Sequence, residues 1–328
     1  MPLLQFTPKG IFCAQGNFYI DPWQPVEHAL ITHAHSDHAR HGSNKYLCHN
    51  YTVPILQLRL GVGNYQGVTW GQTIFINGVQ ISFHPSGHII GAAQIRVAYK
   101  GEIWVCSGDY KVDNDGISGA FEAIPCHHFI TESTFGLPIY NWKPQGQLYA
   151  DMQQWVTNNI AEGYNSVFIA YSLGKAQRVL DAVKNLTPNV YAHGAIYNTQ
   201  QVLVQHNLSN LNVIKITADT PKTALKNTII IAPPSTVGTN YLKQMQPYRI
   251  AICSGWMQVR GNTRRQNADK GFALSDHCDW QGLLTAIKAT KASNIYVTHG
   301  FTATLSKYLT EQGLNAVELK TAYGAVDD

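Results

Sequence analysis

The segment ITHAHSDHAR, residues 31–40, constrains this chain most strongly, because it gathers three histidines and an aspartate into six positions: His33, His35, Asp37 and His38. Clustered histidines repel one another once two of them are protonated, so the cluster needs a compensating partner. Imidazole nitrogens and carboxylate oxygens are ligands that zinc and similar divalent ions take in a compact shell. The segment therefore predicts a metal site, and the alternative is a surface loop that is merely rich in histidine.

Further ligands are expected at the ends of other strands, because one short segment cannot surround two ions by itself. Candidates are His88 in SGHIIG, Asp109 in SGDY and His299 in THG. VQISFHPSGH alternates apolar and polar residues with the period of a half-buried strand, and EIWVCSGDY, HHFITEST and NIYVTHG also end in polar residues. Taken singly, His88 has an ordinary explanation as a core histidine and Asp109 as a turn residue. Together with the first cluster they favour one metal centre.

The middle of the chain has a different pattern of elements. LYADMQQWVTNNIAEG has helical apolar spacing and ends at Gly163, a C-cap signal. NSVFIAYSLGKAQRVLDAVKNL indicates a buried strand, a glycine turn and an amphipathic helix, and TIIIAPPST indicates another buried strand. We therefore expect residues 140–272 to form an α/β domain inserted between residues 1–139 and 273–328.

Composition places the chain among folded proteins of about two domains. Its 328 residues are 45% hydrophobic and 13% charged, which allows a large core and excludes general disorder. The opening MPLLQFTPKG has no signal-peptide pattern, and no run reaches the ~18 apolar residues that cross a bilayer. The six cysteines form no CxxC pair, which favours reduced thiols. We expect a cytoplasmic protein without a membrane segment.

Positive charge is concentrated in one stretch. The net charge of the chain is +4, and residues 249–270 carry five cations against one acid, Asp269. These cations are Arg249, Arg260, Arg264, Arg265 and Lys270. The stretch is either a solvated face or a surface that contacts phosphates, and the second interpretation gains weight if phosphate chemistry is found elsewhere.

The pattern HAHSDH, followed by a lone histidine and a lone aspartate, resembles the metallo-β-lactamase fold, an α/β protein with an αββα sandwich. ITESTFG with Glu132, SVFIAYSLGKAQ, LSDHCDW with His277 and YVTHG with His299 resemble the signatures and inserted domain of the β-CASP group, its nucleic-acid-processing members. LLQFTPKGIFC and RRQNADKGFALSDHCDW are most similar to bacterial exonucleases described as DNA ligase-associated. The likeness extends over nearly the whole chain, although the inserted domain is small for the group.

The resemblance implies a set of ligands for two divalent ions, zinc or alternatively manganese. One ion would be held by three histidines and the other by Asp37 and two histidines, with Asp109 bridging them. The histidines are His33, His35 and His88 for the first ion, and His38 and His299 for the second. Asp21 in FYIDPW would brace the site from an earlier strand. Two ions lower the pKa of a shared water and clamp phosphoryl oxygens, so a bridging hydroxide would attack a phosphodiester.

The resemblance also pairs Glu132 with His277. A departing ribose oxygen needs a proton, so His277 would be the general acid, oriented by Glu132, which raises its pKa. The alternative for His277 is a structural role. The catalytic residues would then be His277, Glu132, Asp37 and Asp109.

The segment SLGKAQRV opens the helix of the inserted domain but lacks the GxxxxGK[ST] pattern of a nucleotide-binding loop. Its amides, with Ser172, Gly174 and Lys175, are candidates for binding a phosphate of the substrate. The alternative is a plain strand-to-helix turn. Within the basic stretch, Arg264, Arg265 and Lys270 are favoured as nucleic-acid contacts because they lie nearest to His277 in sequence.

The function implied is that of a metal-dependent nuclease, a DNA exonuclease acting in repair, with a DNA ligase and a helicase as functional partners. The alternatives are an RNA-processing endo- or exonuclease of the same group, a thioester hydrolase on the same fold, and a non-enzymatic nucleic-acid-binding member. The inserted domain, Glu132 and His277 argue against the thioester hydrolase. The complete ligand set argues against the non-enzymatic member.

Overall fold

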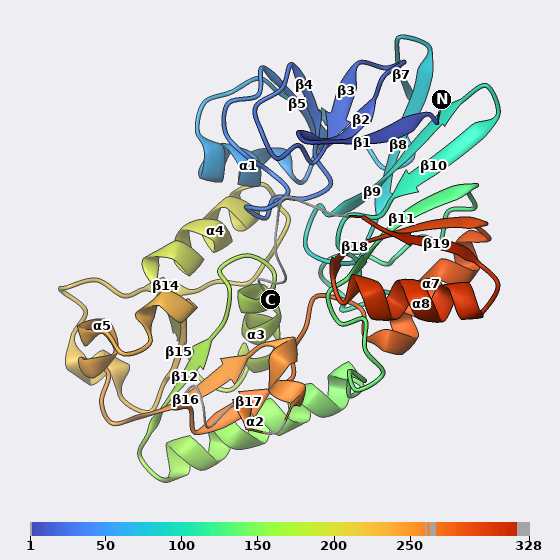
Figure 1. Ribbon diagram of the computed structural model, residues 1–328. Coiled ribbons are helices and arrows are strands. Elements are labelled where there is room, and N and C mark those ends of the chain that lie inside the picture. The colour runs from blue at the N-terminus through green and yellow to red at the C-terminus, as the bar shows by residue number, and fades with distance from the viewer. Residues whose placement is uncertain (1, 260, 263–266, 320–328) are drawn as a thin grey trace. The chain divides into compact units, whose positions relative to one another are not determined.

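The computed structural model describes residues 2–259, 261–262 and 267–319, which divide into two compact units. The first unit combines the chain up to Asn141 with the chain from His277 onward, and the second comprises Trp142–Asp276. The second unit is thus an insertion in the sequence of the first (Figure 1).

The first unit contains two β-sheets and three α-helices among its described residues. The first sheet has the order β1-β2-β3-β4-β5-β6. Its strands are β1 (Leu4–Thr7), β2 (Gly10–Cys13), β3 (Phe18–Ile20), β4 (His28–Leu30), β5 (Lys45–His49) and β6 (Tyr65–Val68), with α1 (Val53–Leu60) between the last two. From β3 to β6 neighbouring strands are parallel.

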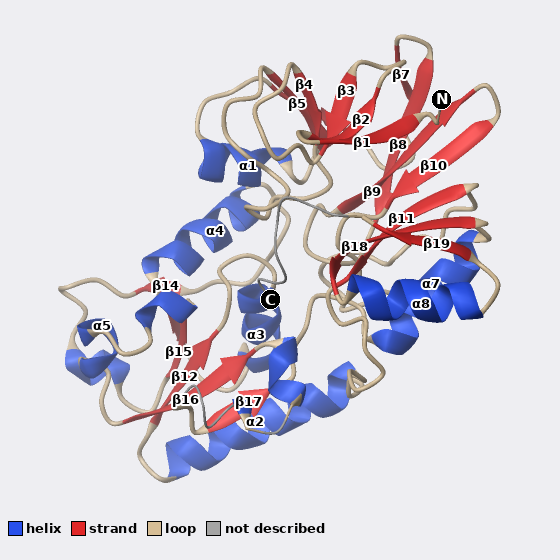
Figure 2. Ribbon diagram, in the orientation of Figure 1, coloured by secondary structure: helices blue, strands red, loops and turns tan. Residues whose placement is uncertain are grey.

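The second sheet has the order β19-β18-β11-β10-β9-β8-β7. Its strands are β7 (Ile74–Ile76), β8 (Val79–Pro85), β9 (Ala93–Tyr99), β10 (Glu102–Cys106), β11 (His128–Ser133), β18 (Asn294–Gly300) and β19 (Asn315–Glu318). Helices α7 (Trp280–Thr290) and α8 (Thr302–Glu311), drawn blue in Figure 2, contact β11, and α8 also contacts β18 and β19.

The core of the first unit follows from the alternation of side chains along β10. Trp104 points toward the first sheet and packs in one cluster with Phe18 and Leu30, whereas Val105 points the other way and packs with Leu283 and other residues of the helices. The second sheet is therefore buried on both faces, as the apolar composition of its central strands requires.

The polar residues at the ends of the central strands meet because these strands are parallel. β10 pairs with β11, and β11 pairs with β18, all in the same direction. Their carboxyl ends therefore lie at one edge of the sheet, which is where ligands of parallel sheets commonly bind. Asp109 follows β10, Glu132 lies at the end of β11, and His299 lies at the end of β18.

The second unit has a sheet in which every described strand pair is parallel, with the order β14-β13-β15-β12-β16-β17. Its strands are β12 (Asn165–Ile169), β13 (Val190–Ala192), β14 (Ile214–Lys215), β15 (Ile229–Ala232), β16 (Tyr248–Cys253) and β17 (Lys270–Phe272). The described helices are α2 (Gln145–Ala161), α3 (Lys175–Val183), α4 (Gly194–Gln205) and α5 (Asn240–Lys243), with 3-10 turns η1 (Lys222–Leu225), η2 (Pro234–Thr236) and η3 (Gly255–Gln258). Phe168 and Val167 of β12 enter clusters on opposite faces of this sheet.

The prediction of a mixed α/β protein is confirmed, since the described residues form several sheets covered by helices. The two-sheet arrangement of the first unit is compatible with the predicted metallo-β-lactamase fold. All six cysteines are free and buried. Within the described residues, no helix has both the length and the apolar character needed to cross a membrane.

Candidate metal centre

All seven residues predicted as metal ligands lie in the first unit, in two groups. One ligand atom from each member lies within 4.8 Å of the others in its group. The groups are His33, His35, His88 and Asp109, and Asp37, His38 and His299. The structure therefore brings together, in the predicted pairing, side chains that are as much as 266 positions apart (from His33 to His299).

The ITHAHSDH segment follows β4 as a tight turn. The amides of His38 and Ala39 both donate to the carbonyl of His35, at 3.3 and 2.9 Å. Arg59, in the last turn of α1, donates to the carbonyl of Ala34. These bonds fix the backbone of the segment, so its ligands reach the same small volume.

His299 is aimed by a bulge at the end of β18. Glu132 pairs with Thr298 and Ser133 with Gly300, so His299 is an extra residue in the ladder. Its φ of 52° lies in the left-handed region, which is uncommon for a residue other than glycine. The Ser133 hydroxyl donates to the His299 carbonyl and holds this conformation. The bulge thus explains why the side chain leaves the alternation of the strand.

His88 and Asp109 each follow a glycine that no larger residue could replace without movement. A β-carbon at Gly87 would lie 2.2 Å from the carbonyl oxygen of Lys111, and one at Gly108 would lie 2.7 Å from the Thr32 side chain. Both glycines also have positive φ. The close approach of these backbones is what places the two ligands beside the ITHAHSDH turn.

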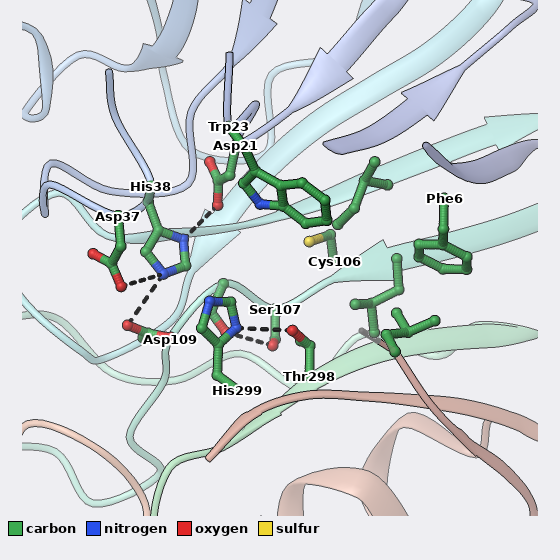
Figure 3. A pocket seen from close by; sticks show the side chains of 14 residues that line it. Phe6, Asp21, Trp23, Asp37, His38, Cys106, Ser107, Asp109, Thr298 and His299 are labelled. Atoms are coloured by element: carbon green, nitrogen blue, oxygen red, sulfur yellow. Dashed lines mark hydrogen bonds and ion pairs between the residues drawn. The ribbon is translucent and has the colours of Figure 1, made fainter. Parts of the chain in front are cut away.

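The Asp109 carboxylate lies between the two groups. Its Oδ2 atom is 3.4 Å from His33 Nε2 and 3.4 Å from His38 Nε2, and 3.8 Å from His88 Nε2. His38 Nε2 is in turn 3.6 Å from Asp37 Oδ2 (Figure 3). One carboxylate oxygen equidistant from nitrogens of both groups has the position expected of a bridging ligand.

Hydrogen bonds at the remote nitrogen orient three of the histidine rings. Nδ1 of His38 lies 2.7 Å from Asp21 Oδ2, and Nδ1 of His299 lies 2.8 Å from the Thr298 hydroxyl (Figure 3). Nδ1 of His33 lies 3.0 Å from the Thr32 hydroxyl. Such contacts to the outer nitrogen fix the tautomer and direct Nε2 toward a metal.

Asp21 braces this arrangement with both carboxylate oxygens. Oδ1 accepts from the Thr32 amide at 2.8 Å, and Oδ2 lies 2.6 Å from the Thr32 hydroxyl as well as facing His38. The φ of Asp21 is 42°, again in the left-handed region. The side chain thus contacts Thr32 and His38 and belongs to neither ligand group, and its bracing role stays a prediction.

The residues present fit a divalent metal. His33 Nε2 and His38 Nε2 are buried without a hydrogen-bond partner, a costly arrangement that a cation would relieve. The rings of His33, His35 and His88 stand edge to face with centroids 4.7 to 4.9 Å apart. Nitrogen and carboxylate donors in this number suit zinc or manganese.

The protonation states also suit metal binding. Burial, followed by the neighbouring His38, lowers the pKa of His33 and of His299. The pKa of Asp109 lies well below its usual value, because His38 and then His277 outweigh the effect of burial. Burial would lower the pKa of His38, but Asp109, Asp37 and Asp21 raise it well above its usual value. A bound cation would replace that proton.

Glu132 and His277 form a buried pair beside this centre. Glu132 Oε2 lies 2.7 Å from His277 Nδ1, and Glu132 Oε1 accepts from the Tyr110 amide at 2.8 Å. Both side chains are at most 5% exposed. Asp109, Glu132 and His277 each offer a polar atom within 4.8 Å of the other two, and the His277 ring lies 4.6 Å from that of His88. The predicted acid thus adjoins Asp109, the carboxylate that was predicted to bridge the ions.

A small cavity extends from the second ligand group (Figure 3). Asp37, His38, Asp109 and His299 form its polar side. Its apolar side is lined by Phe6, Ile11, Trp23, Ile130 and Leu319. Its volume of ≈ 40 Å³ is room for a few water molecules, which the polar side chains would orient.

The predicted phosphate contacts lie in the second unit or outside the described residues. Ser172 is half-buried and Gly174 buried in the turn between β12 and α3. Lys175 is only 2% exposed, and its Nζ lies 3.5 Å from Asp276 Oδ2, so a phosphate would have to compete with that carboxylate. Lys270 is exposed on β17.

The basic stretch as a whole is only partly described. Arg260, Arg264 and Arg265 lie outside the described residues. Arg249 donates to Glu162 at 2.6 Å, and this hydrogen bond raises its pKa. Of the two described cations of this stretch, Arg249 is therefore paired within the protein.

Sequence reasoning missed the groups that orient the ligands. Thr32 directly precedes His33, and Thr298 directly precedes His299. The repeated Thr-His pair is a signal that could have been used. Arg59 gave no such signal, because it lies in a short, mostly apolar helix with no motif around it. The Arg178–Asp276 contact at 3.3 Å joins residues far apart in the sequence.

Comparisons with known proteins show which proteins this chain is similar to. No protein-family model matches the chain. A probable DNA ligase of Opitutus terrae is 28% identical over 312 residues, which cover 94% of this chain and 30% of the relative. The endoribonuclease YSH1 of Eremothecium gossypii is 27% identical over 115 residues, which cover 34% of this chain and 15% of that protein. The endoribonuclease YSH1 of Saccharomyces cerevisiae is 25% identical over 115 residues, which cover 34% of this chain and 14% of that protein. The chain thus spans less than a third of the length of these relatives.

A crystal structure of a protein of unknown function from Enterococcus faecalis V583 resembles this chain in fold alone. Its TM-score is 0.65 at 12% sequence identity, over 90% of this chain and 79% of that one. The curated relatives fit the β-CASP nucleases of the metallo-β-lactamase fold, so the resemblance predicted from the motifs is confirmed.

The brace formed by Asp21 leads to a first prediction. Asp21→Asn keeps the shape of the side chain but removes the charge that faces His38 Nδ1. We expect the affinity for the second metal ion to fall by about 10- to 100-fold, measured by competition with a chromogenic chelator. Asp113→Asn, at an exposed aspartate, is the control. Equal affinities of Asp21→Asn and the unaltered protein would contradict the bracing role.

Proposed function

We propose that this chain is a metal-dependent phosphodiesterase that cleaves nucleic acid, a DNA exonuclease acting in repair. The observation that carries the proposal is the position of the buried His277–Glu132 pair against a centre with ligand sets for two ions. Relatives named as a probable DNA ligase and as endoribonucleases support a nucleic-acid substrate. A DNA ligase and a helicase, which the resemblance led us to expect, are the proposed functional partners.

The ligand sets define what the protein would hold. His33, His35 and His88 would bind one divalent ion, with zinc as the first choice and manganese as the alternative. Asp37, His38 and His299 would bind the other, and Asp109 would touch both. Bound ions of this kind supply a water of lowered pKa and neutralise the oxygens of a phosphodiester. The buried carboxylates and oriented imidazoles keep that geometry fixed.

His277 would donate the proton that the departing oxygen requires. Glu132 holds Nδ1 at 2.7 Å, so the proton is transferred from Nε2. The Tyr110 amide fixes Glu132 in turn at 2.8 Å, and the negative carboxylate stabilises the imidazolium form. Neither residue is needed for a thioester substrate, whose thiolate leaves readily as an anion.

Residues 142–276 are proposed to be the β-CASP domain, which would hold the polynucleotide. Lys270 is exposed there, and Arg264 and Arg265 are assigned to the same role from sequence. Ser172 and Gly174 remain candidates for a phosphate at the start of α3, and Lys175 would join them only where a phosphate displaces Asp276 from its Nζ. RNA is the second candidate substrate, since the YSH1 relatives are endoribonucleases.

The test is digestion of end-labelled single- and double-stranded DNA and RNA with zinc or manganese added. We expect release of mononucleotides from DNA ends, lost in His299→Ala by more than about 100-fold. His206→Ala, at an exposed histidine of the second unit, is the matched control. Cleavage of RNA alone would transfer the proposal to RNA processing, and no cleavage of any polynucleotide with either metal would overturn it.

A further inference from the structure

The chain passes from the second unit to the first between Asp276 and His277. The proposed acid is therefore the first residue after the insertion, and its backbone position depends on how the preceding residues are held. We propose that Arg178 and Lys175 are positioning residues that fix His277 through Asp276. This inference rests on the proposed function, because it assigns a role toward the acid of that reaction.

Arg178 holds the chain immediately before His277 by two contacts. Its NH1 atom donates to the carbonyl of Ser275 and lies 3.3 Å from Asp276 Oδ1. Its NH2 atom donates to Gln145 Oε1 at 3.1 Å, which ties the guanidinium to α2. The planar fork of an arginine can satisfy a carbonyl, a carboxylate and an amide at once, which a lysine cannot.

Lys175 approaches the other oxygen of the same carboxylate. Its Nζ lies 3.5 Å from Asp276 Oδ2. Lys175 and Arg178 are both 2% exposed, and Asp276 is fully buried. The Asp276 carboxylate thus contacts two residues of α3. Helix α3 itself packs on β15 and α2 inside the second unit. The backbone of Asp276 has little freedom to shift.

A purely structural need does not account for this cluster. Removing three charged groups from water is expensive, and apolar residues of similar volume stabilise a core as well or better. In some proteins, buried charges are retained because they fix a particular geometry. Here the geometry that they fix is that of the peptide leading into His277.

The chain after His277 is fixed by the first unit. The Cys278 amide donates to the Tyr110 carbonyl at 2.9 Å, and Asp279 Oδ1 accepts from the Gly282 amide at 2.8 Å at the start of α7. The peptides before and after His277 are thus each held within their own unit, and its Nδ1 lies 2.7 Å from Glu132 Oε2. A catalytic group displaced by about 1 Å can lose about 10²-fold in rate, so the anchor before His277 matters to the proton transfer.

The test uses the full-length protein with its metals. We expect Asp276→Asn to slow DNA cleavage by about 10- to 100-fold, while hydrolysis of bis-p-nitrophenyl phosphate changes by less than about threefold, because nitrophenolate needs no proton. Metal content should be unchanged. Arg178→Lys should retain more DNA cleavage than Arg178→Met, because it keeps one donor for Asp276.

A double-variant cycle separates positioning from general support of the fold. If Asp276 acts through His277, adding Asp276→Asn to His277→Ala should cause no further loss of DNA cleavage. Multiplying losses would overturn the inference, as would equal slowing of both substrates by Asp276→Asn. Asp181→Asn, at an aspartate within α3 that pairs with Lys184 at 2.7 Å, is the control for the loss of a carboxylate from this region.

A charge-matched double variant controls for loss of folding. Lys175→Met combined with Asp276→Asn removes one charge of each sign, so it leaves no additional buried cation without compensation. Thermal unfolding identifies which variants are folded at the assay temperature. If this folded double variant cleaves DNA like the unaltered protein, the positioning role is wrong. If His277→Ala slows DNA cleavage no more than hydrolysis of bis-p-nitrophenyl phosphate, His277 is not the acid. The proposed function is then wrong, whatever the result for Asp276.

Discussion

Asp109→Ala is expected to remove both metal ions and to abolish nucleic-acid cleavage. The Oδ2 atom of Asp109 lies 3.4 Å from nitrogens of both ligand groups, so one substitution takes a ligand from each ion. Loss of a group that merely supports a ligand costs about 10- to 100-fold in metal affinity, and we expect a shared ligand to cost more at both sites. Elemental analysis of the purified protein should show a fall from about two ions per chain to below one.

The control for this prediction is Asp151→Ala, which removes a half-buried aspartate of the second unit that pairs with Lys143 at 2.9 Å. It should retain both ions and full activity. The pKa of His38 in the metal-free protein provides a second measurement. Asp109 is the largest of the charges that raise the pKa of His38, so in metal-free Asp109→Ala that pKa should fall. Two ions per chain retained in Asp109→Ala would contradict the bridging arrangement.

The clustering of the candidate ligands could be predicted from the sequence, because parallel strands leave a simple pattern in it. Each strand is a short apolar run, and its end is marked by a polar residue at a turn, as at Asp109 and His299. Parallel pairing then brings those ends to one edge of a sheet. The α/β class followed from the same alternation of strands and helices, which local periodicity is sufficient to indicate.

The supports of the ligands could not be predicted in the same way. The Thr32 and Thr298 hydroxyls matter because of where they point, and a bulge with positive φ aims His299. Neither the direction of a hydroxyl nor a bulge changes the apolar periodicity of a strand. The sequence therefore marks the candidate ligands, and for the groups that orient them it offers only the repeated Thr-His pair as a signal.

Lys175 shows a further limit of sequence reasoning. A lysine after a glycine turn at the start of a helix is typical of a phosphate contact, yet here its Nζ faces Asp276 and is almost entirely buried. Burial depends on what packs over a side chain, and in this case the covering residue lies 101 positions later (Lys175 to Asp276). The predicted contacts of Arg264 and Arg265 stay predictions, because both lie outside the described residues.

His277→Ala is expected to slow DNA cleavage by about 10² to 10⁴-fold. A ribose or deoxyribose oxygen is a strongly basic leaving group, so its departure depends on a proton from His277. Nitrophenolate leaves as an anion, and hydrolysis of bis-p-nitrophenyl phosphate should therefore stay within about tenfold of the unaltered protein. Metal content should not change, because the ring of His277 contacts Glu132 at 2.7 Å and lies outside both ligand groups.

Glu132→Gln gives a graded version of the same result. It keeps the side-chain shape and an oxygen for the Tyr110 amide but removes the charge that stabilises the imidazolium, so its loss should be smaller and equally selective for DNA. Equal slowing of DNA and nitrophenyl substrates by His277→Ala would instead identify a structural role. Loss of metal would make His277 a ligand, and the third group formed by Asp109, Glu132 and His277 would then be the site to examine. The leaving-group comparison therefore decides between an acid that protonates a nucleotide and a histidine that only holds the centre together.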